Sequence, residues 1–212
     1  MIDLKNIIAK QLPRMPRPYI VRLMMDRVHE AMIIIKKQPN KRPIILGGCV
    51  FRPFYSQKFA EIVFLAITTN EQVKGYGTRL MNKLKDHAQK KSIHYFLTYA
   101  DNNAIEYFRK QGFMKCPTLP EARWKGFIKD YNGSTMMQCV VHREIKHETI
   151  YGDIRKQRDA IIGEILKVIT LRRHQGLKFE PRPDGGFFDF EFSQIPGLKS
   201  AGWDHKKYAL EK

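Results

Sequence analysis

The chain has 212 residues, of which 43% are hydrophobic and 11% aromatic, a composition typical of a globular protein rather than of a disordered one. A chain of this length can bury one substantial core with an appendage. No apolar run approaches the roughly 20 residues that a membrane helix needs, and the first residues do not resemble a signal peptide. Three widely separated cysteines predict reduced thiols in a cytosolic or nuclear protein, without a zinc site.

The formal net charge is +17, from 38 Lys and Arg residues against 21 Asp and Glu residues. A basic excess of this size predicts an anionic partner, such as nucleic acid or an acidic protein surface. The alternative is a basic surface that is only solvated.

The first third of the chain predicts two helices followed by strands. Residues 3–11 have apolar side chains at helical spacing and stop before Pro13, and Pro16 and Pro18 can open a second helix. Strand-like stretches follow at 31–35, 44–51 and 59–68. The second of them contains Gly47 and Gly48, which indicate a bulge or a close neighbour.

The middle of the chain predicts alternating helices and strands. In chain order, these are a helix at 79–91, a strand at 95–99, a helix capped by Asp101 or Asn102 that runs to Gln111, a strand that starts at 113–115 and a strand at 135–141. Together the elements predict an α/β fold with a mixed, mostly antiparallel sheet flanked by helices.

The amino-acid composition and pattern of the chain change at Lys146. Apolar residues between Ile154 and Ile169 predict an amphipathic helix that ends at Arg172 and Arg173. The stretch 176–194 is rich in glycine, proline and phenylalanine, which indicates docking onto another surface. We therefore expect a domain at 1–145 and a helical, aromatic-rich extension at 146–212 that binds a partner.

A glycine turn joins the strand that begins at Phe59 to the helix that begins near Arg79. Gly75 and Gly77 lie in this turn, where a chain can aim several backbone N–H groups at a phosphate. There is no Gly-x-x-x-x-Gly-Lys, and Leu80 replaces the third glycine of a dinucleotide fingerprint. What remains is Gln-x-x-Gly-x-Gly, which can hold a pyrophosphate or be a plain turn.

Glu61 is the one carboxylate in this strand. Strict alternation would place it on one face together with Phe59, Val63, Leu65 and Ile67. Desolvation among apolar groups would raise its pKa toward neutrality, which suits a general base. The alternative is a buried ion pair with an arginine.

Several longer motifs carry a resemblance to a known family. They are Gln11–Pro16, Phe59–Phe64, Gln72–Gly77, Tyr95–Asp101, Tyr107–Phe113 and Ile128–Tyr131. In this order and spacing they resemble the catalytic domain of the Gcn-five type histone acetyltransferases, members of the GNAT superfamily, from Leu4 to about Arg143. Ile195–Leu198 and Ala201–Trp203 resemble the segment beyond that domain.

The chain departs from the family pattern in three respects. Leu65 stands where many members have cysteine, and Asn103 and Glu106 stand where an aromatic residue and a glycine are usual. The strand that normally precedes the first helix is absent. A carboxylate at Glu106 would weaken the binding of a phosphorylated ligand unless it points away.

The resemblance implies a reaction and its catalytic residues. Acetyl-CoA would be the co-substrate, no metal would take part, and a lysine amine would attack directly in a ternary complex. Glu61 would be the general base, the backbone N–H of Leu65 would stabilise the oxyanion, and Tyr107 would be the general acid. The alternative for Tyr107 is an ordinary core residue.

The resemblance also implies the binding residues. The pantetheine arm would pair with Leu65, Ala66 and Ile67. The pyrophosphate would be held by Gln72, Val73, Lys74, Gly75, Tyr76, Gly77 and Thr78. The other wall would consist of Asn103, Ala104, Ile105 and Glu106. The lysine substrate would lie near Asp130 and Tyr131.

The expected function is therefore acetylation of a lysine in a core histone tail, with histone H3 as the first candidate, in the nucleus. Expected partners are histone tails, nucleosomes and coactivator subunits that contact the extension. Nucleosomal DNA or an acidic subunit would account for the excess charge. Two alternatives stay open: a GNAT enzyme for another amine, such as a polyamine, an antibiotic or a protein N-terminus, and a non-catalytic basic adaptor for DNA or coactivator subunits.

Overall fold

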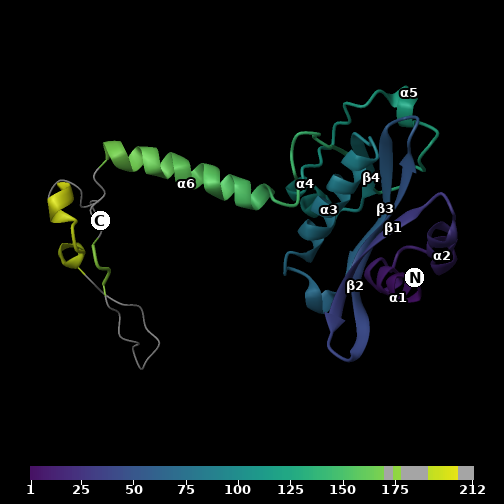
Figure 1. Ribbon diagram of the computed structural model, residues 1–212, viewed down its shortest axis with the longest axis horizontal. Helices are drawn as coiled ribbons and strands as arrows, with labels where there is room; N and C mark the ends of the chain where they lie inside the picture. The colour runs from purple at the N-terminus through teal and green to yellow at the C-terminus, as the bar shows by residue number, and fades with distance from the viewer. Residues whose placement is uncertain (170–173, 178–190, 205–212) are drawn as a thin grey trace. The chain divides into compact units, whose positions relative to one another are not determined.

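The computed structural model describes residues 1–169, 174–177 and 191–204, and the chain divides into two units, Met1–Asp153 and Ile154–Lys212. The first unit contains the sheet and most of the helices (Figure 1). Its elements are α1 Ile2–Gln11, α2 Arg17–Met25, β1 Glu30–Gln38, β2 Lys41–Phe54, β3 Phe59–Ile67, the 3-10 turn Thr69–Glu71, α3 Tyr76–Lys90, β4 Tyr95–Ala100, α4 Ile105–Lys110, α5 Glu121–Trp124 and β5 Thr135–Val140.

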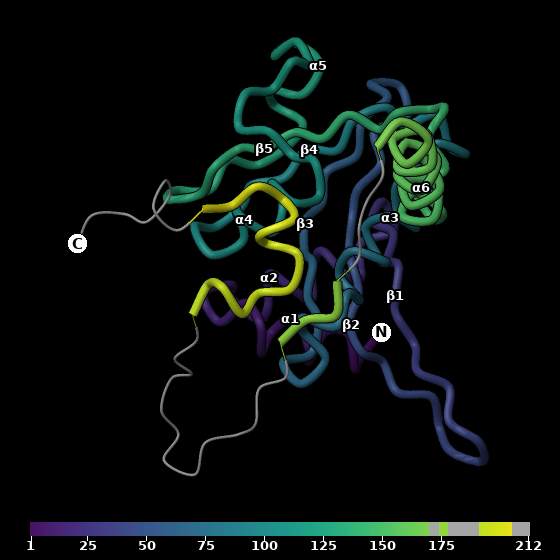
Figure 2. Tube along the Cα trace, turned by 90° about the vertical axis from the view of Figure 1, so that its left-hand side faces the viewer, coloured from purple at the N-terminus to yellow at the C-terminus, as the bar shows by residue number. Residues whose placement is uncertain are grey.

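The five strands form one sheet in the order β1-β2-β3-β4-β5. Neighbouring strands run antiparallel except for β3 and β4, which are parallel and are joined through α3. Figure 2 shows β1 and β5 at opposite edges of this sheet. The expected α/β fold with a mixed, mostly antiparallel sheet is confirmed.

Helices cover both faces of the sheet (Figure 1). On one face, α1 and α2 bury a cluster that contains Leu4, Ile8, Ile20, Val50 and Phe64. On the other face, α3 and α4 bury a larger cluster, which includes Leu80, Met81, Leu84, Ile62, Phe96 and Phe108. The apolar stripe of α3 therefore faces the sheet, as its helical spacing predicts.

The strand expected at 113–115 does not form. Met114 makes a single bridge to Gln138, with the two backbone N–H groups donating to the opposite carbonyls at 2.8 Å. Pro117 and Pro120 follow closely, and proline cannot donate a ladder hydrogen bond. Pro120 instead precedes α5, a short helix that the sequence did not predict.

The side chains of β3 do not alternate strictly, so the predicted grouping of Glu61 with Leu65 and Ile67 is wrong. Opposite the step from Val50 to Phe51 in β2, the pairing skips from Phe64 to Ile62, which leaves Val63 as a bulge. Ile62, Leu65 and Ile67 consequently pack on the α3 side, whereas Val63, Phe64 and Ala66 pack on the α1 side. A bulge reverses the alternation because it adds one residue to a period of two.

β3 and β4 separate soon after they pair. Their parallel ladder joins Phe59 to Tyr95, Ala60 to Phe96 and Glu61 to Leu97, and it ends there. Beyond it, Thr98 Oγ1 donates to the Ile62 carbonyl at 3.0 Å, while β3 continues to Ile67 along β2. The sheet is therefore open next to the C-terminal half of β3.

The second unit begins within α6, Ile150–Val168, and its other described elements are the 3-10 turns Phe192–Gln194 and Lys199–Ala201. The predicted amphipathic helix is present, but its expected end at 172–173 and most of the aromatic-rich stretch lie outside the described residues. No helix in the described part of the chain is long and apolar enough to span a membrane.

Candidate active site

The turn between β3 and α3 leaves backbone donors free at a helix N-terminus. The first helical hydrogen bond of α3 runs from Arg79 N to Gly75 O at 3.0 Å, so the N–H groups of Tyr76, Gly77 and Thr78 have no acceptor within the helix. Gly75 has φ +79°, a left-handed conformation that glycine adopts without strain. Free donors and the helix dipole together make this turn a candidate phosphate site.

The turn is held in place from both ends. Gln72 Nε2 donates to the Ile67 carbonyl and to Gln11 Oε1, each at 3.0 Å, which ties the turn to the end of β3 and to α1. Val73 is fully exposed and has φ +63°. A β-branched residue rarely adopts this conformation, and such strain is concentrated at ligand-binding turns.

Gly77 is in close contact with Tyr107. The Tyr107 hydroxyl donates to the Gly77 carbonyl at 2.9 Å, and a Cβ at Gly77 would lie 3.1 Å from Tyr107 Cε2. Burial raises the pKa of Tyr107 well above its ordinary value, so the hydroxyl stays protonated at neutral pH. Tyr107 thus links α4 to the N-terminus of α3, in addition to any role as an acid.

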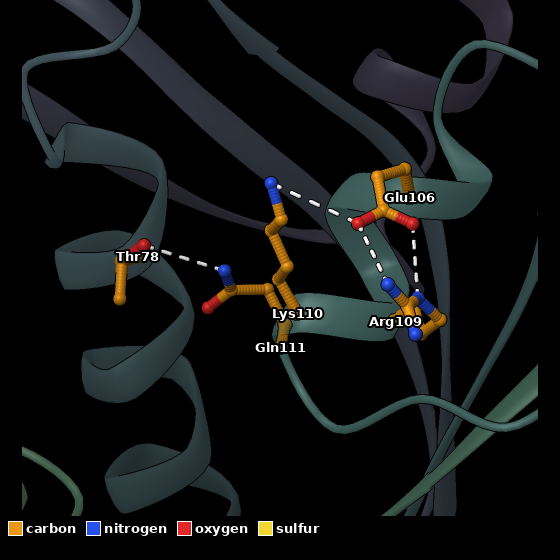
Figure 3. A network of polar contacts seen from close by, with 5 residues as sticks. All are labelled: Thr78, Glu106, Arg109, Lys110 and Gln111. Atoms are coloured by element: carbon orange, nitrogen blue, oxygen red, sulfur yellow. Dashed lines mark hydrogen bonds and ion pairs between the residues drawn. The ribbon is translucent and has the colours of Figure 1, made fainter. Parts of the chain in front are cut away.

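Two charged residues of the predicted binding site are paired locally. Lys74 Nζ lies 3.0 Å from Glu71 Oε2, so its charge at the turn is partly offset. The exposed carboxylate of Glu106 accepts from Arg109 Nε at 2.9 Å and from Nη2 at 3.0 Å, and Lys110 Nζ lies 3.7 Å away (Figure 3). These cations lower the pKa of Glu106 and neutralise the charge expected to oppose a phosphorylated ligand.

The predicted opposite wall lies at the start of α4. Ala104 is the N-cap, Asn103 belongs to the preceding turn, and Ile105 and Glu106 are the first helical residues. Asp101 Oδ1 accepts from the Ala104 N–H at 2.8 Å, so Asp101 stabilises this turn rather than capping α4 itself. Thr78 of α3 and Gln111 share a hydrogen bond of 3.3 Å, which connects the ends of the two helices (Figure 3).

Glu61 is buried, with 8% of its surface exposed. Desolvation raises its pKa to about 7, although the positive charge of Arg52 on the neighbouring strand acts in the opposite direction. Arg52 lies over the Phe54 ring, 4.7 Å from its centroid, and within the described residues no ion pair or hydrogen bond involves the Glu61 side chain. The geometry therefore does not show the alternative, a buried ion pair between Glu61 and an arginine.

Two tyrosines from distant parts of the chain, Tyr99 and Tyr131, lie near enough to this carboxylate to feel its charge. The rings of Tyr99 and Tyr131 are 5.9 Å apart, and the Tyr131 and Tyr19 hydroxyls share a short hydrogen bond across 112 positions. Burial, followed by the Tyr19 hydrogen bond, raises the pKa of Tyr131, and Glu61 adds to the effect. Burial and then the neighbouring Asp130 carboxylate raise the pKa of Tyr99.

We call Tyr19, Tyr99 and Tyr131 the tyrosine cluster. Lys129 Nζ lies 5.3 Å from the Tyr19 ring centroid and 5.6 Å from that of Tyr131, so the cluster already accommodates an ammonium group. The structure thus brings Tyr131 near Glu61 and Asp130 near Tyr99. Sequence reasoning missed Tyr19 and Tyr99, because nothing local marks a tyrosine that meets a partner so far along the chain.

The predicted residues fall into two connected groups. Leu65, Ala66 and Ile67 run along the open side of β3 toward the turn at 72–78, and Leu65 packs in the same cluster as Tyr107. Glu61 and the tyrosine cluster lie at the other end of the opening between β3 and β4. No group of His, Cys, Asp and Glu in the described part of the chain could hold a metal ion.

Residues 3–113 match the acetyltransferase (GNAT) family, and the chain belongs to that family. Within it, the chain is 58% identical to Tetrahymena GCN5, whose crystal structure superposes with a TM-score of 0.64 over 68% of this chain and 88% of the other. A second similar structure is the catalytic domain of the Tetrahymena GCN5 histone acetyltransferase in complex with coenzyme A. It is 57% identical, with a TM-score of 0.54 over 69% of this chain and 86% of the other.

Full-length relatives also match. The histone acetyltransferase GCN5 of Oryza sativa subsp. japonica is 45% identical over 100% of this chain and 41% of its own length. The chain thus spans less than half the length of the curated relatives it matches.

Proposed function

We propose that this chain transfers the acetyl group of acetyl-CoA to a lysine of a histone tail. One observation carries the proposal: Glu61, a buried carboxylate without an ion-pair partner in the described residues, has a pKa of about 7 and lies on the strand that leads into the phosphate turn. Likeness to enzymes named histone acetyltransferase supports the acceptor. Mass spectrometry of nucleosomes incubated with the chain and acetyl-CoA tests it, with a histone H3 tail lysine as the expected product.

Glu61 supplies the base that the reaction needs. A lysine amine has a pKa of about 10.4 in water and is protonated at neutral pH, so it cannot attack a thioester. Glu61, with its pKa of about 7, is half ionised there and can accept the proton, directly or through one water. The neutral amine then attacks the acetyl carbon and forms a tetrahedral intermediate. Its collapse breaks the carbon–sulfur bond, and the proton that the nitrogen loses is balanced by the proton that the leaving thiolate takes up.

The other residues stabilise charge and hold the ligand. The backbone N–H of Leu65 would donate to the oxygen on which negative charge develops, and a leucine in place of cysteine preserves that donor. Tyr107 would return a proton to the leaving sulfur, and it also holds Gly77 in position. Ala66 and Ile67 would pair with the pantetheine arm, because β4 has left this side of β3.

The phosphate turn fits coenzyme A. It offers three free N–H groups at the start of a 15-residue helix, and the Glu106 carboxylate is engaged by Arg109. Asn103, Ala104 and Ile105 would complete the opposite wall. We assign the lysine stem to the tyrosine cluster, with Asp130 beside it, since aromatic rings next to a carboxylate suit a cationic side chain.

Two other functions make different predictions. A GNAT enzyme for another amine would acetylate a polyamine, an aminoglycoside or a protein N-terminus in preference to a histone peptide, which a panel of acceptors would reveal. A non-catalytic adaptor would bind DNA or coactivator subunits but not acetyl-CoA, and calorimetry with acetyl-CoA separates it from an enzyme. The buried Glu61 and the free donors of α3 favour the enzyme.

We assign chemistry to the first unit and partner binding to the extension. The segment after Lys146 is tied to α3, because Asp86 accepts from the backbone N–H groups of His147 and Glu148 at 2.9 and 3.0 Å. A truncated chain should therefore end after Asp153 rather than at Lys146. Residues 1–153 should acetylate free histone peptide within about threefold of the full rate, because every proposed catalytic residue is present. A folded 1–153 chain that binds no acetyl-CoA would contradict this division.

The excess positive charge should affect the rate of acetylation only when DNA is present. If the net charge of +17 contacts nucleosomal DNA, affinity should fall roughly as the −0.9 power of salt concentration for each phosphate contact. Raising salt from about 50 to about 200 mM should then depress initial rates on nucleosomes much more than on free histone peptide. Parallel curves would contradict a DNA contact and would favour a solvated surface or an acidic subunit. A nuclear location and coactivator partners are part of the same proposal.

A further inference from the structure

Four basic side chains from four separate segments gather at the end of the sheet where β3 and β4 begin. They are Lys58 in the turn before β3, His94 just before β4, Arg123 of α5 and Arg143 shortly after β5. We call them the basic cluster. The parallel ladder of β3 and β4 starts here, with Phe59 opposite Tyr95, and the Arg123 guanidinium lies 5.8 Å from the centroid of the Tyr95 ring. The fold therefore brings together cations that lie far apart in the sequence.

Hydrogen bonds fix the segments of the basic cluster to one another. The His94 N–H donates to the Lys58 carbonyl at 2.8 Å, and Arg143 Nε donates to His94 Nε2 at 3.1 Å. Arg123 Nη2 donates to the carbonyl of Gln57, the residue before Lys58. Because these bonds join different segments and two of them use backbone groups, the proximity of the cations is a property of the fold.

The positive charge of the basic cluster is not balanced locally. Among the described residues, its lysine and its two arginines form no ion pair. The Glu121 carboxylate of α5 is engaged by Lys125 at 2.9 Å, and Glu144 forms no ion pair in that part of the chain either. Burial and then the three neighbouring positive charges lower the pKa of His94, so the ring is neutral at pH 7 and can accept from Arg143. Like charges that are held together without a counter-charge favour an anionic ligand.

The basic cluster is separate from the phosphate turn. β3 has nine residues, and at about 3.3 Å per residue its two ends are roughly 25 Å apart. Lys58 directly precedes this strand, whereas Gln72–Thr78 follow it. Coenzyme A with its pyrophosphate in the turn therefore does not account for the cluster. Glu61 lies between the two sites, about 10 Å along the strand from Lys58.

We propose that the basic cluster binds backbone phosphates of double-stranded DNA. Each guanidinium has five N–H donors and uses only one or two of them within the cluster, so others remain for a phosphate. DNA carries one negative charge per about 1.7 Å of helix axis, so neighbouring phosphates can meet side chains from several segments at once. The net charge of +17 also matches a long polyanion better than a short acidic segment. The inference deepens the proposed function, on which it rests for the nucleosome as the source of the DNA.

Anisotropy titrations of the full-length chain with a fluorescein-labelled DNA duplex of about 20 base pairs test the inference. Lys58→Ala with Arg143→Ala removes two charges from exposed side chains. At about 0.1 M salt, this double variant should bind the duplex at least about tenfold more weakly than the parent chain. The slope of log affinity against log salt should also fall by about 1.8, which is about 0.9 for each lost phosphate contact. Unchanged affinity and slope would overturn the inference.

Two control variants separate a local contact from net charge and from misfolding. Lys36→Ala with Lys37→Ala makes the same change in charge on β1, far along the sheet order, and should alter DNA affinity less than about twofold. Lys58→Ala alone removes no hydrogen bond of the cluster, because Lys58 contacts His94 through its backbone carbonyl, and it should lower the salt slope by about 0.9. Equal losses in the two double variants, or a parental slope in Lys58→Ala, would contradict the site.

An acidic peptide tests the class of ligand. A fluorescein-labelled peptide of about ten Glu residues should bind the parent chain and the Lys58→Ala, Arg143→Ala variant with affinities within about threefold of each other. If the variant loses as much affinity for this peptide as for DNA, the basic cluster serves an acidic protein segment and the DNA assignment is wrong.

Acetylation rates distinguish this inference from the proposed function. The Lys58→Ala, Arg143→Ala variant should acetylate free histone peptide within about twofold of the parent rate, because neither residue belongs to the proposed active site, and nucleosomes severalfold more slowly. A parent chain that acetylates peptide, together with a variant that keeps full DNA affinity, would contradict the inference alone. If the variant loses DNA affinity but neither chain acetylates histone peptide, the DNA site is supported and the proposed function is contradicted.

Discussion

Glu61→Gln should lower kcat about 10²- to 10⁴-fold at neutral pH, while acetyl-CoA affinity stays within about twofold. Glutamine keeps the shape of the side chain but cannot accept the proton of the lysine ammonium. The loss should shrink as pH rises, because free amine becomes available from solution. Single-turnover rates on a histone peptide between about pH 6 and 10, with acetyl-CoA affinity measured in parallel, test the assignment. A near-native rate at pH 7 would contradict it.

The unsubstituted chain provides the complementary pH profile. Glu61 must be ionised to act as a base, so kcat/KM should rise with pH through about 7, the pKa that desolvation gives this carboxyl. Without that shift, the rise would be centred near pH 4.5. A flat profile between about pH 5 and 8 would contradict the assignment even if Glu61→Gln is inactive for another reason.

The same variant should be more stable than the parent chain at high pH. The folded-state pKa of Glu61 is raised from 4.5 to about 7, so the folded state holds this proton more tightly than the unfolded state does. Stability is therefore lost as pH rises from about 4.5 to 7, by roughly 3 kcal/mol at about 1.36 kcal/mol per pKa unit. Glutamine avoids that loss, because it is never charged.

Urea unfolding of both chains at about pH 4 and pH 8 measures this difference. The gap in unfolding free energy should be small at pH 4 and should favour Glu61→Gln by up to about 3 kcal/mol at pH 8. Equal stability at both values would show that Glu61 is not desolvated. A gain in stability combined with a loss of turnover is the pattern expected of a residue retained for function.

Gly77→Val should raise the acetyl-CoA dissociation constant at least about tenfold. The added Cβ would lie 3.1 Å from the Tyr107 ring, and the branched side chain would move the turn whose backbone N–H groups face the phosphate site. Each hydrogen bond to a charged group contributes about 1.5–3 kcal/mol, so displacement of one or two donors accounts for the loss. Calorimetry with acetyl-CoA measures it.

Two control variants test whether the affinity loss in Gly77→Val comes from the phosphate turn. Gly152→Val places the same side chain at a glycine whose Cβ position has open space, and it should leave affinity unchanged. Gly77→Val combined with Tyr107→Ala removes the clash and should recover part of the affinity, although it also removes the Tyr107 hydrogen bond. Native acetyl-CoA affinity in a folded Gly77→Val chain would mean that the turn does not hold the pyrophosphate.

Local patterns in the sequence determined the types and order of most elements in the first unit, with the exceptions of α5 and of the strand expected at 113–115. The apolar stripe of α3, the prolines at the start of α2 and the β-rich run from Phe59 all act over a few neighbouring residues, so they can be recognised without the fold. The carboxylate, the open half of β3 and the phosphate turn fall within one contiguous stretch, 59–78. Their relative order therefore follows from chain connectivity alone.

Tertiary packing decided which side chains meet. The bulge at Val63 follows from the register of β3 against β2, and this register is set by the whole buried face rather than by the residues of β3 alone. Tyr19 of α2 reaches Tyr131 in the loop before β5, and Tyr107 of α4 reaches Gly77 of α3, because the fold packs these segments against one another. Contacts over such separations leave no periodic signal, since they depend on how the elements pack and not on their spacing.

The pairing of charged side chains and the position of a strand in the sheet also depend on the tertiary structure. The sequence showed a carboxylate at Glu106 but not that Arg109 and Lys110, one helical turn away, neutralise it, because that outcome depends on side-chain conformations. It also showed that residues near Ala31 to Ile35 form a strand, but not that this strand pairs with β2 at one end of the sheet order. Strand propensity is a local property, whereas the position of a strand in a sheet is set by all of its neighbours.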